Sequence, residues 1–167
     1  DPMARAESSQ SLQPGAPAPA FDLVDTVSGA RVSLDALRLS RGVVVAFICN
    51  HCPYVKAVLD RIIRDARELQ AYGIGSVAIM SNDPADYPED SFENMQRIAR
   101  EKNFPFPYLW DETQEVAKAY SAVCTPDFFG FNKDLELQYR GRLDASGRQP
   151  APPDARRELF EAMVQIA

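Results

Sequence analysis

Apolar residues in the middle of the chain form two compact runs separated by a longer helical repeat. Residues 43–48 are continuously apolar and largely β-branched, which is typical of a strand covered on both faces. From Val55 to Leu69, apolar residues recur at the spacing of one face of a helix, and Gly73 is a suitable stop. Residues 76–80 form the second apolar run. A strand, a helix and a strand in succession predict the core of an α/β fold.

Shorter patterns extend this unit in both directions. Residues 21–23 and 30–34 alternate apolar and polar positions around a Thr-Val-Ser-Gly turn, which predicts a β-hairpin. Ser33 is placed to cap a short helix over residues 34–39. The remaining predicted elements are, in chain order, a loop at 82–90, a helix from 92 to 103, a strand at 107–110, a helix at 113–120, a hairpin over 128–139 and a final helix from Pro152 onward.

This order of elements predicts an α/β fold in which helices flank a central mixed β-sheet. No internal repeat and no second-domain boundary interrupts the pattern, so we expect one domain over residues 14–167. Residues 4–20 are rich in Ser, Gln, Pro and Ala. We therefore expect residues 1–13 to form a flexible arm or an added remnant ahead of the domain.

Charge and composition limit the classes of partner that the chain can bind. The 167-residue chain has a net charge of -6 and a pI near 4.8, and no Lys/Arg cluster offsets this charge. Phosphate binding needs a concentrated positive patch, so nucleic-acid and membrane partners are disfavoured. No apolar run approaches the roughly 20 residues that span a bilayer, and the N-terminus has no signal pattern. Three cysteines can persist reduced in a cytosol, so we expect a cytoplasmic protein, whereas the oligomeric state stays open.

Two of the three cysteines, Cys49 and Cys52, form a Cys-x-x-Cys pair where the first apolar run meets the helix. A structural zinc site normally needs a second pair of ligands, and only Cys124 and His51 are left to supply it. His51 lies between the two thiols, where it does not easily complete the same tetrahedron. The pattern therefore favours a redox role without a metal or a cofactor.

The redox interpretation assigns a different task to each thiol. Cys49 is expected at the turn, exposed at a helix N-terminus, where unpaired N–H groups and the helix dipole stabilise a thiolate. Pro53 fits the first helical turn because N–H groups there lack helical partners. Cys52 is expected one turn into the helix, shielded from solvent, and placed to attack a mixed disulfide on Cys49.

Four further residues have both a functional and a structural interpretation. His51 is either a polar cap of the helix or an imidazole that lowers the pKa of Cys49 and makes the disulfide more oxidising. Thr125 and Pro126 are either an ordinary turn or, with a cis proline, a backbone edge that binds an incoming peptide beside Cys49. Cys124 is either a small core residue or a third redox or metal-binding thiol.

Four segments carry a family resemblance: Pro-Gly-Ala-Pro-Ala-Pro-Ala-Phe at 14–21, Phe-Ile-Cys-Asn-His-Cys-Pro-Tyr-Val at 47–55, Thr-Pro at 125–126 and Tyr-Arg-Gly-Arg-Leu-Asp at 139–144. They resemble the thioredoxin-fold superfamily, most closely its peroxiredoxin-like, AhpC/TSA-type branch, over residues 14–167. The resemblance implies a thioredoxin-like fold with an N-terminal β-hairpin. It also implies an extra βα unit between the Cys-x-x-Cys helix and the cis-proline loop. Cys49 would be the nucleophile, Cys52 the resolving thiol and Pro126 the cis proline.

The chain also departs from the family pattern. Peroxiredoxins place the peroxidatic cysteine in Pro-x-x-x-Thr-x-x-Cys. If Cys52 takes that position, Val45 replaces the proline and Cys49 replaces the threonine, so the peroxide-binding hydroxyl is missing. The buried acid of thioredoxins is replaced by Val43, so the proton acceptor for Cys52 is either an acid from elsewhere or water. A histidine before the second cysteine is similar to that of disulfide isomerases and periplasmic disulfide oxidases.

The sequence therefore predicts a thiol–disulfide oxidoreductase that exchanges disulfides with protein or small-molecule thiols through Cys49 and Cys52. Two alternatives stay open. One is an antioxidant thiol peroxidase with Cys52 as the peroxidatic cysteine. The other is a metal-binding thioredoxin-like module that uses Cys49, Cys52 and Cys124. The substrate, the electron donor, the direction of electron flow and a distant resolving thiol beyond Ala167 are left open as well.

Overall fold

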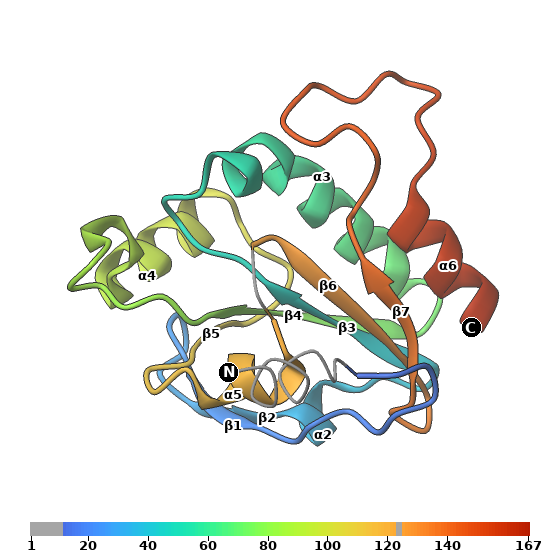
Figure 1. Ribbon diagram of the computed structural model, residues 1–167, viewed down its shortest axis with the longest axis horizontal. Coiled ribbons are helices and arrows are strands. Elements are labelled where there is room, and N and C mark those ends of the chain that lie inside the picture. Colours follow the sequence, from blue (N-terminus) through green and yellow to red (C-terminus); the bar gives the residue numbers. More distant parts are fainter. Residues whose placement is uncertain (1–11, 123–124) are drawn as a thin grey trace, which may run out of the picture.

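The computed structural model describes residues 12–122 and 125–167, and within them seven strands form a central mixed sheet (Figure 1). The strands pair in two groups, β2-β1-β5-β4 and β3-β6-β7. The groups adjoin where the Ile48 N–H donates to the Ile79 carbonyl oxygen at 3.0 Å. Within the described groups, β4 and β5 pair in parallel and the other neighbours pair antiparallel. The strands are β1 (Asp22–Asp25), β2 (Arg31–Ser33), β3 (Gly42–Phe47), β4 (Ile74–Met80), β5 (Tyr108–Trp110), β6 (Asp127–Asn132) and β7 (Leu137–Gly141).

Helices cover both faces of the sheet (Figure 1). α3, α4 and α6 lie on one face, and α2 and α5 lie on the other. In the part of the chain that the structure describes, no helix is long and apolar enough to cross a bilayer. The helices are α2 (Leu34–Leu37), α3 (Pro53–Gln70), α4 (Phe92–Glu101), α5 (Glu115–Tyr120) and α6 (Glu158–Ile166), with a 3-10 turn at Pro88–Asp90.

β3 is buried on both faces, as its continuous apolar run predicts. Alternate residues of a strand point to opposite faces, so β3 contributes to two hydrophobic clusters. The cluster under α3 contains Val44 and Ala46, and the cluster on the side of α5 contains Val45 and Phe47. The chain leaves β3 between these clusters and turns directly into α3, which places the Cys-x-x-Cys pair at the end of the most buried strand.

The structure confirms the predicted α/β class, the N-terminal hairpin and the inserted unit between α3 and Thr125, which contains α4 and β5. Ser33 caps α2 by accepting a hydrogen bond from the Ala36 N–H. The predicted start of the last helix was wrong, because α6 begins at Glu158 rather than Pro152. Residues 152–155 form a turn instead, which is closed by the Ala155 N–H donating to the Pro152 carbonyl oxygen at 3.0 Å. Residues 1–11 of the predicted arm lie outside the described residues.

Candidate active site

The two cysteines lie in the turn that joins β3 to α3. β3 ends at Phe47, and α3 begins at Pro53 with Cys52 as its N-cap residue. Proline suits this position because the N–H that it lacks would have no partner inside the helix. Cys52 therefore lies at the start of the helix, not one turn inside it, and the sequence prediction was wrong on this point.

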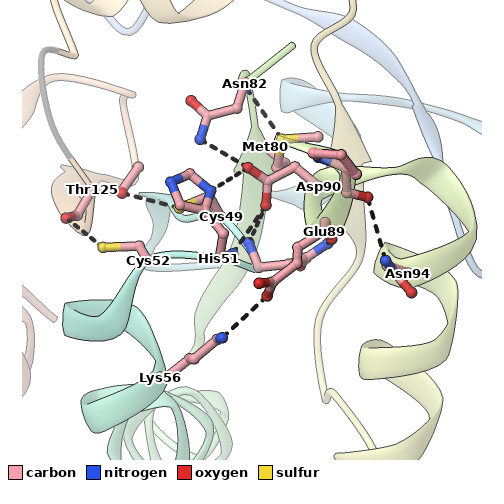
Figure 2. Close-up of polar contacts among 12 residues, drawn as sticks. Cys49, His51, Cys52, Lys56, Met80, Asn82, Glu89, Asp90, Asn94 and Thr125 are labelled. Carbon is pink, nitrogen blue, oxygen red and sulfur yellow. Dashed lines mark hydrogen bonds and ion pairs between the residues drawn. The ribbon is translucent and has the colours of Figure 1, made fainter. Parts of the chain in front are cut away.

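Both thiols converge on Thr125 (Figure 2). The Cys49 Sγ lies 3.3 Å from the Thr125 Oγ1, and the Cys52 thiol donates to the Thr125 carbonyl oxygen at 3.5 Å. Thr125 reaches the turn because it precedes β6, which pairs with β3 along its whole length. The peptide bond between Thr125 and Pro126 is cis. Cys124 lies outside the described residues.

The two thiols differ in their access to solvent. Cys52 is 9% exposed and lines an open cleft of about 620 Å³. Cys49 is 2% exposed and faces a smaller cavity of about 240 Å³ beside α4. The prediction that Cys49 is the exposed thiol was therefore wrong, because its side chain continues β3 into the hydrophobic cluster beneath α3.

The environment of Cys49 disfavours a thiolate. The pKa of this thiol is raised to about 11, chiefly by burial. The contact with the Thr125 hydroxyl opposes the shift, and the negative charge of Asp90 adds to it. A thiol with this pKa is protonated near neutral pH. Cys49 therefore does not have the stabilised thiolate that the sequence predicted.

Asp90 is a buried carboxylate that binds the turn between β3 and α3 (residues 48–52) from the loop after β4 (Figure 2). Its side chain has no exposed surface. Oδ1 accepts hydrogen bonds from the backbone N–H groups of Asn50 (2.6 Å) and His51 (3.1 Å). Oδ2 accepts from the Asn82 amide (3.0 Å) and lies 2.5 Å from the His51 Nδ1. Four donors thus occupy the acceptor positions of one carboxylate.

The same loop holds the turn through two further residues. The ring of Tyr87 stacks on His51, with the ring centroids 4.0 Å apart and the planes 3° from parallel. The Glu89 carbonyl accepts from the Asn50 side-chain amide at 2.9 Å, and the Glu89 carboxylate pairs with Lys56 of α3 at 3.1 Å. His51 is therefore fixed between Asp90 and Tyr87, and it does not cap α3.

Asp90, Tyr87 and Asn82 are site residues that the sequence did not predict. From the sequence, residues 82–90 are only a loop rich in prolines and acidic residues. The one available signal was the missing acid at Val43, which left the proton acceptor for Cys52 as either an acid from another segment or water. In the structure a buried carboxylate from another segment, Asp90, does reach the turn, but it binds Asn50, His51 and Asn82.

Cys49, His51 and Asp90 also present potential metal-ligand atoms within 4.8 Å of one another. Thiolate, imidazole and carboxylate groups are ligands that zinc accepts. The Asp90 oxygens are already occupied by four hydrogen-bond donors, so a metal ion would have to displace His51 from Asp90. We therefore assign no metal to this cluster.

Comparisons with known proteins identify the family. The AhpC/TSA family profile matches residues 14–140. The chain belongs to the AhpC/TSA family. This AhpC/TSA protein is 45% identical to an uncharacterized conserved protein from Geobacillus kaustophilus, with a TM-score of 0.85 over 92% of this chain and 83% of that chain. It is 33% identical to a hypothetical protein from Sinorhizobium meliloti, with a TM-score of 0.80 over 93% of this chain and 86% of that chain.

More distant structures share the thioredoxin fold with this AhpC/TSA protein. One is a secreted disulfide oxidoreductase from Mycobacterium tuberculosis, which is 18% identical and has a TM-score of 0.65 over 87% of this chain and 95% of that chain. A comparison with curated proteins finds no match. The predicted family and the predicted thioredoxin-like fold are thus confirmed.

In this AhpC/TSA protein, replacing His51 by alanine is expected to raise the pKa of Cys49 further. Without the imidazole, the charge of Asp90 beside Cys49 is less compensated, so the thiolate is less stable. We expect the ratio of thiolate to thiol at a given alkaline pH to fall about tenfold, which corresponds to about 1.4 kcal/mol. The ultraviolet absorbance of the thiolate, followed against pH in protein that also carries Cys52→Ser and Cys124→Ser, measures the change.

The Asp90→Asn variant is expected to shift the pKa of Cys49 in the opposite direction, because it removes the negative charge. Asp86→Asn makes the same charge change on an exposed residue of the same loop and serves as the control. Equal pKa values of Cys49 in the His51→Ala, Asp90→Asn and unchanged proteins would remove both residues from the electrostatics of the pair.

Proposed function

We propose that this chain is a thiol–disulfide oxidoreductase that exchanges disulfides with protein or small-molecule substrates through Cys49 and Cys52. The observation that carries the proposal is the convergence of both thiols on Thr125 at the edge of an open cleft. Membership of the AhpC/TSA family supports an oxidoreductase in general terms.

The different burial of the two thiols suggests their order of reaction. Cys52 lines the cleft, so its thiolate meets a substrate disulfide RS–SR first, forms a Cys52–S–S–R bond and releases one RS⁻. Cys49 then attacks the Cys52 Sγ, which closes the Cys49–Cys52 disulfide and releases the second RS⁻. Two electrons pass to the substrate, and both protein thiols lose their protons. This order is the reverse of the one that the family resemblance implies.

The cleft that Cys52 lines has the size of a small-molecule site. Its volume of about 620 Å³ lies within the usual range of about 300–1,000 Å³ for such sites. Its walls combine apolar side chains with polar groups, and a small thiol or one side chain of a peptide fits this space. The lining residues include Phe47, Ile79, Ala117, Asn82, Gln114 and Lys118.

Counting free thiols at defined redox potentials tests the proposal. The chain has three cysteines, so the fully reduced protein should take three alkyl groups. The oxidised protein should take one, on Cys124, with Cys49 and Cys52 protected as a disulfide. The transition should fit a single two-electron couple. A disulfide that includes Cys124, or no loss of free thiols in oxidising buffers, would contradict the proposal.

A thiol peroxidase is the second candidate. Cys52 starts the helix and lines the cleft, which is where the AhpC/TSA pattern places a peroxidatic cysteine. Against this, Cys49 replaces the threonine of that pattern, and the hydroxyl of Thr125 faces Cys49, not Cys52. Stopped-flow mixing with hydrogen peroxide separates the candidates. A fast reaction that is lost in Cys52→Ser and kept in Cys49→Ser would favour the peroxidase.

A further inference from the structure

The carboxylate of Asp90 is completely buried, and its partners belong to the turn between β3 and α3 or lie beside it. Burying a charged group costs free energy unless hydrogen bonds compensate it. Here the compensation comes from the N–H groups of Asn50 and His51, from the His51 ring and from Asn82. The arrangement fixes one tautomer and one orientation of His51, as the acid of a Ser-His-Asp triad does for its histidine.

We propose that Asp90 positions His51 as the base that takes the proton from Cys49 when the Cys49–Cys52 disulfide closes. This inference rests on the proposed function, since it concerns the closing step of the same reaction. One of the two ring nitrogens of His51 lies within 4.8 Å of the Cys49 Sγ, so the imidazole is close enough to exchange a proton with this thiol through water.

The hydrogen bond to Asp90 leaves a proton acceptor on the imidazole ring. A carboxylate only accepts hydrogen bonds, so Nδ1 donates to Asp90 and Nε2 is the basic nitrogen. Nε2 has no hydrogen-bond partner within residues 12–122 and 125–167 of the structure. Figure 2 shows this second nitrogen turned away from Asp90. His51 also lines the cleft, which gives the proton a route to solvent.

The closing step balances as follows. Cys52 carries the mixed disulfide with the substrate, and the Cys49 S–H transfers its proton through water to the His51 Nε2. The Cys49 thiolate forms a bond to the Cys52 Sγ, and the bond between Cys52 and the substrate sulfur breaks and releases RS⁻. His51 becomes an imidazolium, which the Asp90 carboxylate stabilises, and then loses its proton to solvent or to RS⁻.

Cys49 needs such a base because its environment keeps it protonated. Burial and the charge of Asp90 hold the pKa of this thiol at about 11, so thiolate is rare near neutral pH without a proton acceptor. A positioned base that acts in the transition state contributes about 100-fold or more to the rate of a proton transfer. Asp90 would thus destabilise the free Cys49 thiolate, and it would also favour transfer of the Cys49 proton to His51.

Other titratable groups face Cys49 from neighbouring elements. Burial raises the pKa of Tyr108 well above its usual value, so this phenol stays neutral. Charged groups around the smaller cavity are held in ion pairs with other residues. These groups are Lys56, which pairs with Glu89, Lys102, which pairs with Asp60, and Glu101, which pairs with Arg97. The His51–Asp90 pair is therefore the proton acceptor that the geometry favours.

The closing step can be measured by itself. Reduced Cys124→Ser protein is mixed with one equivalent of 5,5′-dithiobis-(2-nitrobenzoate). The first thionitrobenzoate is released when Cys52 forms the mixed disulfide, and the second is released when Cys49 closes the pair. The rate of the second release is followed as the pH is raised. With His51 as the base, this rate should increase and then level off once the base has lost its proton.

Two variants remove the base or its positioning residue. For Asp90→Asn and for His51→Gln, the second release should be about 100-fold slower near neutral pH. In these variants the rate of the second release should also keep rising about tenfold per pH unit, because the Cys49 thiolate then forms only by pre-equilibrium ionisation. Combining the two changes should slow the step no further than the slower single variant, because the residues act as a unit.

A purely structural role for Asp90 predicts a different result. Removing its charge makes the Cys49 thiolate easier to form, so the second release would be unchanged or faster and would keep its pH profile. That outcome would overturn the proposal. Asp86→Asn is the matched control, because it changes the same charge at an exposed position of the same loop and should leave the rate unchanged.

The test also works if Asp90→Asn fails to fold. A rate of second release that rises without levelling off in protein with Asp90 and His51 intact would by itself overturn the assignment of His51 as the base. Asp90→Glu keeps the carboxylate and should restore a profile that levels off. A missing second release in the intact pair would instead reject the proposed function. A normal second release with identical profiles in all variants would reject the roles of His51 and Asp90 and leave the proposed function standing.

Discussion

Replacing Cys52 by serine in Cys124→Ser protein is expected to abolish both thionitrobenzoate release steps, whereas Cys49→Ser in the same protein should keep the first and lose the second. Cys52 lines the cleft and Cys49 is almost completely covered, so the proposed order has Cys52 begin the exchange. A serine hydroxyl is a far weaker nucleophile than a thiolate at neutral pH, so each variant stops at its own step. Stopped-flow absorbance follows the two steps, and mass spectrometry should find the mixed disulfide trapped on Cys52 of Cys49→Ser.

Cys124→Ser is the control for both variants and should show the two steps with unchanged stoichiometry. If Cys52→Ser kept a fast first step, Cys49 would be the attacking thiol, as the family resemblance implies. The turn would then have to open for each reaction, because the Cys49 side chain has almost no exposed surface.

Replacing Phe129 by alanine is expected to lower the free energy of unfolding by about 3–5 kcal/mol. Phe129 has no exposed surface and makes edge contacts with Phe47 and Tyr120, whose ring centroids lie 5.7 Å and 5.3 Å away. The Arg140 guanidinium lies 4.8 Å from the Phe129 ring centroid. The smaller side chain loses these contacts and leaves a cavity between β6 and α5. Urea unfolding followed by circular dichroism measures the change.

Val27→Ala is the control for this measurement. Val27 is 40% exposed in the turn between β1 and β2, so its truncation should change the free energy of unfolding by less than about 0.5 kcal/mol. A loss below about 1 kcal/mol for Phe129→Ala would show that the cluster around Tyr120 collapses to fill the cavity, and that the packing behind β6 contributes little to stability.

Elements whose signals are local could be predicted from the sequence. The apolar run of β3 and the helical repeat of α3 each depend on residues within one element, and both were found where the sequence placed them. The start of α6 was missed because the apolar repeat begins only at Leu159, and nothing in that repeat separates the helix from the turn at residues 152–155.

The site residues also separate into those that a local sequence motif predicts and those that it does not. The Cys-x-x-Cys pair, its histidine and the Thr-Pro dipeptide are visible as short motifs, and the structure brings Cys49, Cys52 and Thr125 into contact. Asp90 lies about forty positions from the turn in sequence, and no periodic pattern links the two. The exposure of each thiol depends on how β3 enters the core, so the sequence could not decide which cysteine faces the cleft.

Because Asp90 binds the turn from another segment, the site cannot be moved to another protein as one continuous stretch of sequence. A segment copying residues 42–70 would carry both cysteines and His51 on a strand and a helix. It would lack the carboxylate that binds the turn and the threonine that both thiols contact. A designer who wishes to move the site to another scaffold must therefore graft three segments, one from each of the β3–α3, β4–α4 and α5–β6 connections. The Cys-x-x-Cys motif locates the site in the sequence, but the two distant loops supply the carboxylate and the threonine that complete it.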